Sequence, residues 1–487
     1  MEQLSSRMIQ KKEQPIKVVQ FGEGNFLRGF VDYMIDMANE QGIFNGGVAI
    51  VKPIPFGTLD AFRKQDNLYT LILRGVENGQ TVEQTRIIQS VQKTVDCYQE
   101  YEEYMALARL DSLEFIVSNT TEAGIVLDKE DKLELKPQNS YPGKLTAFLY
   151  ERYRYFKGDR SKGVTVLPVE LIEANGKKLK ECVFSLCEIW NMEQDFRDWL
   201  SEAVIFCSTL VDRIVSGYPR DTAEELWQKL GYEDRLLDVA EPFALWVIES
   251  DKDISERFPL DKAGMKIVFT KDMTPFRTRK VRILNGAHTS TVLGAYLAGK
   301  DIVLECMHDT VIRKFMETVM FDEIAPTVAL PREEVLQFAN SVLERFDNPF
   351  IKHSLLSISL NSVSKWKSRI LPSFKDSYAA TGKLPKLLTF SFAALLCFYC
   401  STDRKTDYLA GNRNGQEYKI MDDQDILDFF AKAAALEPME YVRAVASHTA
   451  FWGEDLTAYH GFTETVAAYI EKVRAVGMRK VLEDLTA

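Results

Sequence analysis

Residues 16–38 read IKVVQFGEGNFLRGFVDYMIDMA, and this segment is the strongest indication of the fold of the N-terminal part of the chain. The first six residues are a short β-rich run. A turn with Gly22, Gly24 and Gly29 follows at once, and residues 30–38 are apolar with a helical period. This order predicts a strand, a tight glycine turn and a helix.

Further strands and helices are expected to alternate along the first half of the chain. A second strand over residues 48–51 completes one β-α-β unit. More strands are expected over residues 68–73, 115–117 and 164–169, and helices over residues 101–110 and 144–155. Such alternation favours an α/β domain with a mostly parallel sheet.

From about Lys280 onward, β-rich runs become scarce and helical patterns take over. Long helices are expected over residues 287–297, 311–324, 333–346 and 462–485, with a turn or short hairpin at 412–415. The C-terminal half is therefore predicted to be helical. The sequence has no linker of low complexity, so we expect the halves to pack closely, with a ligand-binding cleft between them.

The composition is that of an ordinary folded, acidic protein. The chain has 487 residues, a net charge of −11, 46% hydrophobic and 27% charged residues. An acidic protein repels phosphate backbones and anionic lipids, so binding to nucleic acid or to a membrane surface is not expected. Residues 1–17 are polar and lack a signal peptide's apolar core, and the longest apolar stretch, residues 387–400, is too short to span a bilayer. We therefore expect a cytoplasmic protein.

The seven cysteines are scattered and predict reduced thiols rather than a disulfide framework. Cys397 and Cys400 form a C-x-x-C pair inside an apolar stretch, without a second pair or a nearby histidine. We interpret this pair as core packing, not as a metal or redox site.

The glycine turn is the first candidate functional feature. Glycines allow a backbone to approach a pyrophosphate, and the following helix offers free N–H groups to it. The third glycine, Gly29, lies farther along than usual, so a plain strand-to-helix turn stays an alternative. The second strand runs into Lys52-Pro53 instead of an acidic residue that would bind a ribose. The choice between NAD and NADP as the cofactor therefore stays open, and Lys52 would tolerate the 2′-phosphate of NADP.

The second feature is the spacing of Lys280, Asn285 and His288. On an α-helix at 100° per residue these side chains fall within an arc of roughly 140°, so they could face one pocket. The rise from Lys280 to His288 would be about 12 Å, longer than any hydrogen bond. Either the lysine reaches forward, or the helix starts near Asn285 as its N-cap. A solvated helix start with a core histidine is the alternative.

Two further segments carry candidate residues. Asp212 and Arg213 are flanked by apolar residues, so we expect both to be partly buried, as a structural or a functional pair. Asn175 lies in the segment 171–176 after a predicted strand, where a simple turn is the alternative.

Together, these segments resemble the mannitol dehydrogenase family of long-chain polyol dehydrogenases. The resemblance rests on residues 20–28, 115–124, 204–221, 280–289 and 351–353. It implies an α/β Rossmann-type domain over residues 1–275 that binds the dinucleotide, and a mostly α-helical domain over residues 276–487 for substrate binding and catalysis. It also implies an NAD-dependent dehydrogenase that uses no metal.

The resemblance implies a role for individual residues. Lys280 would be the general acid and base, Asn175 and Asn285 would hold the developing alkoxide, and His288 would orient the substrate. Asp212 and Lys365 match substrate-binding positions of the family. The cofactor-binding residues would be Phe21, Gly22, Gly24, Asn25, Phe26, Arg28, Asn119 and Thr120.

These residue types suit hydride addition to a ketone. Negative charge develops on the oxygen, and a lysine with two asparagine amides supplies a proton and fixed hydrogen-bond donors without a metal. None of the five histidines forms an i, i+4 pair, which argues against a zinc enzyme.

The expected small-molecule partner is a sugar acid. Within the family the segments are most similar to members that reduce a keto-uronate. In mannitol-specific members an arginine stands eight residues before the substrate-binding lysine, and here that residue is Ser357. A uronate carboxylate needs an extra cation, for which we favour Lys365 and Arg369 over Lys352 and His353. A solvated helix face is the alternative for this basic segment. Another polyol dehydrogenase or a non-catalytic nucleotide-binding regulator are the competing functions, and the oligomeric state stays open.

Overall fold

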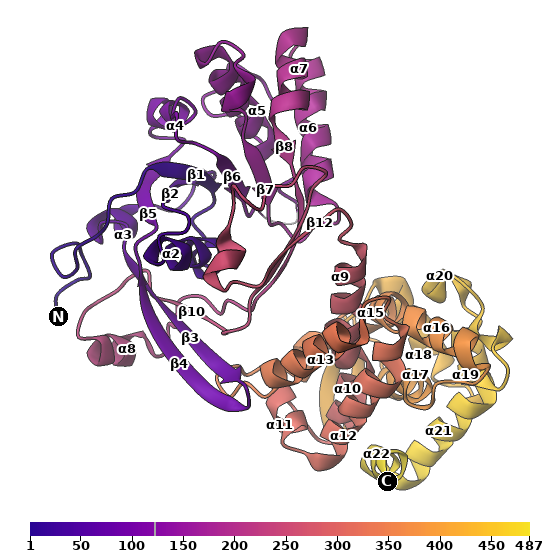
Figure 1. Ribbon diagram of the computed structural model, residues 1–487. Helices are drawn as coiled ribbons and strands as arrows, with labels where there is room; N and C mark the ends of the chain where they lie inside the picture. Colours follow the sequence, from indigo (N-terminus) through magenta and orange to yellow (C-terminus); the bar gives the residue numbers. More distant parts are fainter. Residues whose placement is uncertain (121–122) are drawn as a thin grey trace. The chain divides into compact units, whose positions relative to one another are not determined.

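The computed structural model describes residues 1–120 and 123–487. The chain forms two compact units (Figure 1). The N-terminal unit comprises Met1–Arg74 and Val82–Met273, and the C-terminal unit comprises Thr274–Ala487 together with Gly75–Thr81. The short segment Gly75–Thr81 therefore groups with residues far from it in sequence.

The N-terminal unit contains a six-stranded parallel sheet in the order β5-β2-β1-β6-β7-β8. Its strands are β1 (Ile16–Phe21), β2 (Gly47–Lys52), β5 (Val91–Asp96), β6 (Phe115–Ser118), β7 (Thr165–Pro168) and β8 (Ile205–Phe206). The strands predicted at residues 16–21, 48–51, 115–117 and 164–169 are thus confirmed. They read as nearly continuous apolar runs because both faces of a parallel sheet are buried.

Alternate residues of β1 enter two separate cores. Val18 packs on one face with helix α2 (Tyr33–Glu40) and α3 (Asp60–Lys64). Val19 and Phe21 pack on the other face with four helices: α4 (Tyr101–Leu107), α5 (Tyr141–Tyr155), α6 (Asn175–Ile189) and α7 (Gln194–Ala203). This is the helix-sheet-helix layering expected for a Rossmann-type domain.

The strand predicted at residues 68–73 exists but belongs to a different sheet. It is β3 (Tyr69–Glu77), which lies between β10 (Asp238–Ala240) and β4 (Gln80–Ile88). Strand β4 was not predicted, because most of its residues are polar and exposed. The turn between β3 and β4 contains Asn78 and Gly79, both with positive φ, a pair typical of tight hairpins.

A further sheet, in the order β12-β11-β9, was also not predicted from the sequence. It consists of β9 (Ser208–Asp212), β11 (Leu245–Glu249) and β12 (Ile267–Thr270), and β9 runs antiparallel to β11. These strands are short, so their apolar period is weak. Helix α8 (Ala223–Leu230) lies in the same part of the chain.

The C-terminal unit is mostly helical, as predicted. Its longer helices are α10 (Gly286–Leu297), α12 (Thr310–Thr318), α13 (Arg332–Phe346), α15 (Ser362–Arg369), α16 (Leu371–Thr381), α17 (Lys386–Tyr399), α18 (Gln424–Ala433), α19 (Pro438–Ala446), α21 (Phe462–Val476) and α22 (Met478–Thr486). The expected hairpin is present as β13 (Leu409–Arg413) and β14 (Gln416–Ile420). The helix expected over residues 462–485 is divided at Gly477, whose φ of +83° ends α21.

Helix α17 is the apolar stretch around Cys397, and nearly all of its residues are buried. Its neighbours include α10 and α21. Within the part of the chain that the structure describes, no helix is long and apolar enough to cross a membrane. All seven cysteines are free thiols.

Candidate functional site

The three glycines of the turn after β1 have three different environments. Gly22 has a φ of +128°, and a Cβ there would lie 3.3 Å from the carbonyl oxygen of Asn119. A Cβ on Gly24 would meet no other atom within 4 Å, so the backbone there is open to a ligand. A Cβ on Gly29 would lie 3.0 Å from Val215. A strained turn, an open approach and close helix packing are the three uses of glycine in a dinucleotide-binding turn.

A cavity of about 550 Å³ lies at the carboxyl ends of β1, β2 and β6. Gly22 and Glu23 follow β1, Pro53 follows β2, and Asn119 and Thr120 follow β6. In the sheet, β2 lies on one side of β1 and β6 lies on the other, so the strand order reverses direction at β1. In open α/β sheets, ligands bind at this switch in strand order.

Loop residues that follow β7 hold two of the predicted cofactor-binding residues. The Asn119 amide donates to the carbonyl oxygen of Val169 at 3.2 Å. The backbone N–H and the hydroxyl of Thr120 both donate to Glu170 Oε1, each at 3.0 Å. Glu170 is buried and was not singled out from the sequence. Thr121 and Glu122, which belong to the same sequence motif, lie outside the described residues.

The other predicted cofactor-binding residues do not all present side chains to the cavity. Gly24 and Asn25 are exposed beside the turn, and Phe26 stacks on Phe30. Phe21 is fully buried in the core. The Arg28 guanidinium points into the protein, where it donates to the Leu236 carbonyl oxygen and to Asn25 Oδ1.

Lys52 does not offer its charge to a ligand, which corrects the expectation that it tolerates a 2′-phosphate. Its side chain is 1% exposed. The ammonium donates to the carbonyl oxygens of Ile54 at 2.6 Å and Phe56 at 3.2 Å, and it pairs with Asp96 Oδ2 at 3.1 Å. The three N–H donors of the Lys52 ammonium are thus all satisfied by these three oxygens.

Asn175, at the first turn of α6, has no exposed surface. Its Nδ2 lies within 3.2 Å of the carbonyl oxygens of Pro168, Glu170 and Thr209. Its Oδ1 accepts the N–H groups of Gly176 and Thr209, each at 2.8 Å. The amide therefore joins the end of β7 to β9, and it can donate to a substrate only by exchanging one of these bonds.

Asp212 and Arg213, at the end of β9, are both buried, as expected. Arg213 donates to the carbonyl oxygens of Gly29 at 2.8 Å and Glu241 at 2.9 Å, and it lies over the Tyr33 ring. Burial lowers the pKa of Arg213 to about 10. The arginine thus ties β9 to the helix after the glycine turn.

Lys280 and Asn285 lie in one continuous helix. It comprises α9 (Thr274–Arg279), a π-helical turn η4 (Lys280–Asn285) and α10. The helix therefore does not begin at Asn285, which has helical dihedral angles and makes no capping hydrogen bond with its side chain. The N-cap alternative is wrong, because the preceding residues continue the helix.

The π-turn brings the predicted catalytic residues onto a common face. A π-turn holds one residue more than an α-turn. Two residues that are five positions apart across a π-turn are therefore separated by roughly the same angle around the helix axis as residues four positions apart in an α-helix. The arc that contains Lys280, Asn285 and His288 shrinks from about 140° to roughly 60°. Lys280 and Asn285 are both partly exposed.

His288 is 7% exposed, and it lies among aromatic and basic side chains of its own unit. Its ring centroid lies 4.1 Å from that of Phe346 and 5.2 Å from that of His353. Burial lowers the pKa of His288 well below its usual value, and His353, Arg369, Arg345 and Lys365 add to this effect. The imidazole is therefore neutral at pH 7, with one nitrogen able to donate and one to accept.

Lys365 and Arg369 lie one turn apart on α15, and both belong to the surroundings of His288. Arg369 Nη1 is 3.4 Å from the hydroxyl of Thr289, and Lys365 Nζ donates to the Ile358 carbonyl oxygen at 2.8 Å. Burial lowers the pKa of both cations. Lys352 is exposed, whereas His353 contacts His288. Because Lys365 and Arg369 are partly buried, this side of α15 is not simply a solvated helix face.

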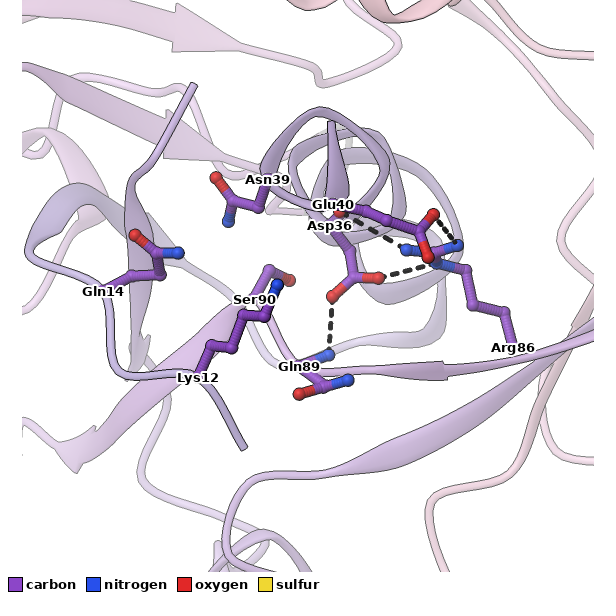
Figure 2. Close-up of a pocket in the computed structure, with 8 residues that line it drawn as sticks. All are labelled: Lys12, Gln14, Asp36, Asn39, Glu40, Arg86, Gln89 and Ser90. Atoms are coloured by element: carbon purple, nitrogen blue, oxygen red, sulfur yellow. Dashed lines mark hydrogen bonds and ion pairs between the residues drawn. The ribbon is translucent and has the colours of Figure 1, made fainter. Parts of the chain in front are cut away.

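A second, smaller cavity of about 90 Å³ lies at the opposite, amino ends of the strands, next to the residues that precede β1 and β5 (Figure 2). Asp36 accepts from Arg86 Nε at 2.6 Å and from the Gln89 N–H at 2.7 Å, and Arg86 also pairs with Glu40. These bonds fix α2 to β4, and we assign the cavity a structural role. Among residues 1–120 and 123–487, no three His, Cys, Asp or Glu side chains are placed to hold a metal ion.

Comparisons with known proteins cover the whole of this architecture. Residues 16–262 match the mannitol dehydrogenase Rossmann domain, and residues 272–474 match the mannitol dehydrogenase C-terminal domain. Altronate oxidoreductase of Bacillus subtilis (strain 168) is 43% identical over 472 residues, 96% of this chain and 95% of that protein. The altronate oxidoreductase of Escherichia coli O1:K1 / APEC is 42% identical and covers 100% of both chains.

Two solved structures share the fold at low sequence identity. D-sorbitol dehydrogenase in its substrate-free form superposes with a TM-score of 0.81 at 18% identity, covering 99% of this chain and 100% of the other. The Pseudomonas fluorescens mannitol 2-dehydrogenase ternary complex with NAD and D-mannitol gives a TM-score of 0.68 at 19% identity, covering 100% of this chain and 99% of the other.

Proposed function

The chain belongs to the mannitol dehydrogenase family, and we propose that this oxidoreductase reduces D-tagaturonate to D-altronate with NADH, reversibly, in the cytoplasm. Two altronate oxidoreductases at 42–43% identity along nearly the whole chain support this substrate. The observation that carries the proposal is the position of Lys365 and Arg369 beside His288, because a sugar acid needs cations that a neutral polyol does not.

The glycine turn and the 550 Å³ cavity fit a dinucleotide. The open backbone at Gly24 would accept the pyrophosphate, and Asn119 and Thr120 would contact the nucleotide at the edge of β6. NADH, when bound, supplies the hydride. NAD is the cofactor we propose, as in the complex of the related mannitol 2-dehydrogenase.

Lys280 would give a proton to the ketone oxygen as the carbon receives the hydride, and it would take that proton back in the direction of altronate oxidation. Asn285 lies on the same face of the helix as Lys280 and would donate a hydrogen bond to the developing alkoxide. His288, neutral at pH 7, would bind a substrate hydroxyl and fix the position of the carbonyl. Each of these residues acts without a metal.

Asn175 and Asp212, both in the N-terminal unit, have the roles that the family resemblance implies. Asn175 would donate to the alkoxide, and the five bonds of its amide with the backbone suggest a second role in holding the end of β7. Asp212 would bind the substrate. Lys365 and Arg369 would bind the carboxylate, whose two oxygens match a bidentate guanidinium.

The test is the rate of NADH consumption by the purified protein with D-tagaturonate, D-fructuronate and D-fructose in parallel, repeated with NADPH. The expected result is the highest kcat/KM with D-tagaturonate and NADH. A preference for D-fructuronate would instead identify a fructuronate reductase (mannonate oxidoreductase), and a preference for fructose another polyol dehydrogenase. NADH binding without turnover of any of the three would indicate a nucleotide-binding regulator.

A further inference from the structure

The corner of the cavity at the end of β2 selects between NADH and NADPH in Rossmann-type domains. An acidic residue that ends β2 accepts a hydrogen bond from the ribose 2′-hydroxyl, whereas a free basic residue binds the 2′-phosphate. Here β2 ends in Lys52, followed by Pro53. The sequence therefore lacks the acidic signal and has a basic residue in its place.

The structure removes Lys52 as a phosphate ligand. Its ammonium is buried, and all three of its donors are directed to Ile54, Phe56 and Asp96. The Asp96 carboxylate is itself fixed at the end of β5, where its Oδ1 accepts the Tyr98 N–H at 3.0 Å. Releasing Lys52 toward a ligand would leave the buried Asp96 carboxylate without its counter-charge.

Glu23, in the turn after β1, supplies the missing acid. It stands between Gly22 and Gly24, and it lines the cavity together with Pro53 and Ile54, the residues that follow β2. It is partly buried, and it lies within electrostatic reach of Lys52 and Asp96. The carboxylate thus belongs to the corner where a β2 acid would stand.

We propose that Glu23 selects NADH over NADPH: its carboxylate accepts the ribose hydroxyl and repels a 2′-phosphate, while Asp96 keeps Lys52 away from that phosphate. This inference rests on the proposed NAD dependence of the enzyme. Two cations act on Glu23: Lys52, which is paired with Asp96, and Arg28, whose guanidinium is directed into the protein. The Glu23 carboxylate is therefore the charge of this group that lines the cavity and that a 2′-phosphate would meet. A phosphate monoester would add a further −1.5 to −2, roughly, at neutral pH.

The experiment is a fluorescence titration of the full chain with NADH and with NADPH, in the absence of sugar substrate. The wild type is expected to bind NADH at least about tenfold more tightly. Glu23→Gln keeps the size of the side chain and removes its charge, so the ratio of the two dissociation constants should fall by about tenfold. Glu83→Gln, on the exposed part of β4, is the matched control and should leave the ratio unchanged.

Asp96→Asn provides an independent second variant. The asparagine retains an oxygen for the Tyr98 N–H but no longer holds the ammonium by charge, so NADPH binding should tighten. Thermal unfolding of both variants checks that the domain is folded. If Asp96→Asn does not fold, the Glu23 variant alone decides.

The outcomes separate this inference from the proposed function. An unchanged ratio in folded Glu23→Gln, or equal binding of both dinucleotides by the wild type, overturns the role of Glu23 and leaves the reaction intact. A wild type that binds neither dinucleotide contradicts the proposed function, and the role of Glu23 with it. Selective NADH binding that depends on Glu23, without turnover of any sugar, supports the inference and removes only the reaction.

Discussion

Two π-helical turns lie in segments that the sequence marks as functional, and they differ in what they expose. In η1 (Arg28–Asp32), after the glycine turn, all five residues are buried. Hydroxyl groups of Tyr69 and Ser90 donate to the carbonyl oxygens of Arg28 and Asp32, at 2.9 and 2.8 Å. In η4 (Lys280–Asn285) only Ile283 is buried.

The same irregularity of the backbone therefore serves two purposes. The wide turn of η1 accepts hydrogen bonds from Tyr69 in β3 and from Ser90 in the loop between β4 and β5, so its backbone groups are satisfied inside the protein. The wide turn of η4 changes the phase of the helix and so brings Lys280 and Asn285 to one face. The first region is suited to packing inside the protein, and the second to chemistry through side chains.

The largest effect is expected from Lys280→Ala in η4. If Lys280 is the general acid, as we propose, its loss should lower kcat by about 10²- to 10⁴-fold. NADH binding and the melting temperature should stay unchanged, because Lys280 is only partly buried. Steady-state NADH consumption and a fluorescence titration measure both. Lys314→Ala, exposed on α12, is the control, and near wild-type turnover of Lys280→Ala would remove the assignment.

Variants of Asn175 and Asn285, the two asparagines for which we propose a catalytic role, should distinguish an effect on stability from an effect on turnover. Asn175→Ala leaves several buried backbone groups of the β7 and β9 ends without partners, so it should lower the free energy of unfolding by about 3 kcal/mol. Asn285→Ala should change stability by less than about 0.5 kcal/mol, because alanine suits a helix. It should nevertheless lower kcat by about 10²-fold.

Urea unfolding and kcat, measured on both asparagine variants, check this contrast. The comparison would fail if Asn285→Ala were the less stable of the two, or if it kept full turnover. In that case the η4 face would be a packing surface.

Substrate selectivity tests the basic residues that lie near His288. Arg369→Gln and Lys365→Gln should each raise KM for D-tagaturonate by about tenfold, because one charge-assisted bond to the carboxylate is lost. KM for D-fructose, which has no carboxylate, should not change in Arg369→Gln. It should rise in Lys365→Gln, because Lys365 matches the position at which the family binds its neutral substrates as well. Lys367→Gln, exposed on the same helix, is the control. If both variants kept the KM of the wild type, the carboxylate would be bound elsewhere.

The smallest effect concerns the buried turn η1. Burial raises the pKa of Asp32 to about 7, against about 3.9 in an unfolded chain. The stability contributed by the neutral carboxyl is complete below the unfolded pKa, and it is lost as the pH rises through the folded pKa. Melting temperature should therefore fall between about pH 4 and pH 7 and level off above that range.

Asp32→Asn should reduce that fall by a few degrees, since its side chain cannot ionise. Asp238, whose pKa burial raises to about 6, should retain part of it. Asp60→Asn, at an exposed position of α3, should behave as the wild type. Equal pH profiles for the wild type and Asp32→Asn would show that Asp32 is ionised in the folded protein.

Features that depend on local sequence pattern could be predicted before the structure. The apolar runs of β1, β2, β6 and β7 are visible because a parallel sheet buries both faces of each strand. The helical half is visible through its period, and the glycine turn through its composition. The same patterns, together with the family resemblance, were enough to propose Lys280, Asn285 and His288 as a group.

Features that depend on partners distant in sequence became visible in the folded protein alone. The π-turn at Lys280 has no signal in composition, and its phase shift of about one residue overturns the 100° geometry used to place Asn285. The bonds of Lys52 to Asp96, of Asn175 to Thr209, and the position of Arg369 beside Thr289 join residues more than thirty positions apart. Such contacts form only when the chain folds, because burial forces each polar group to find whichever partner the packing brings within hydrogen-bond distance.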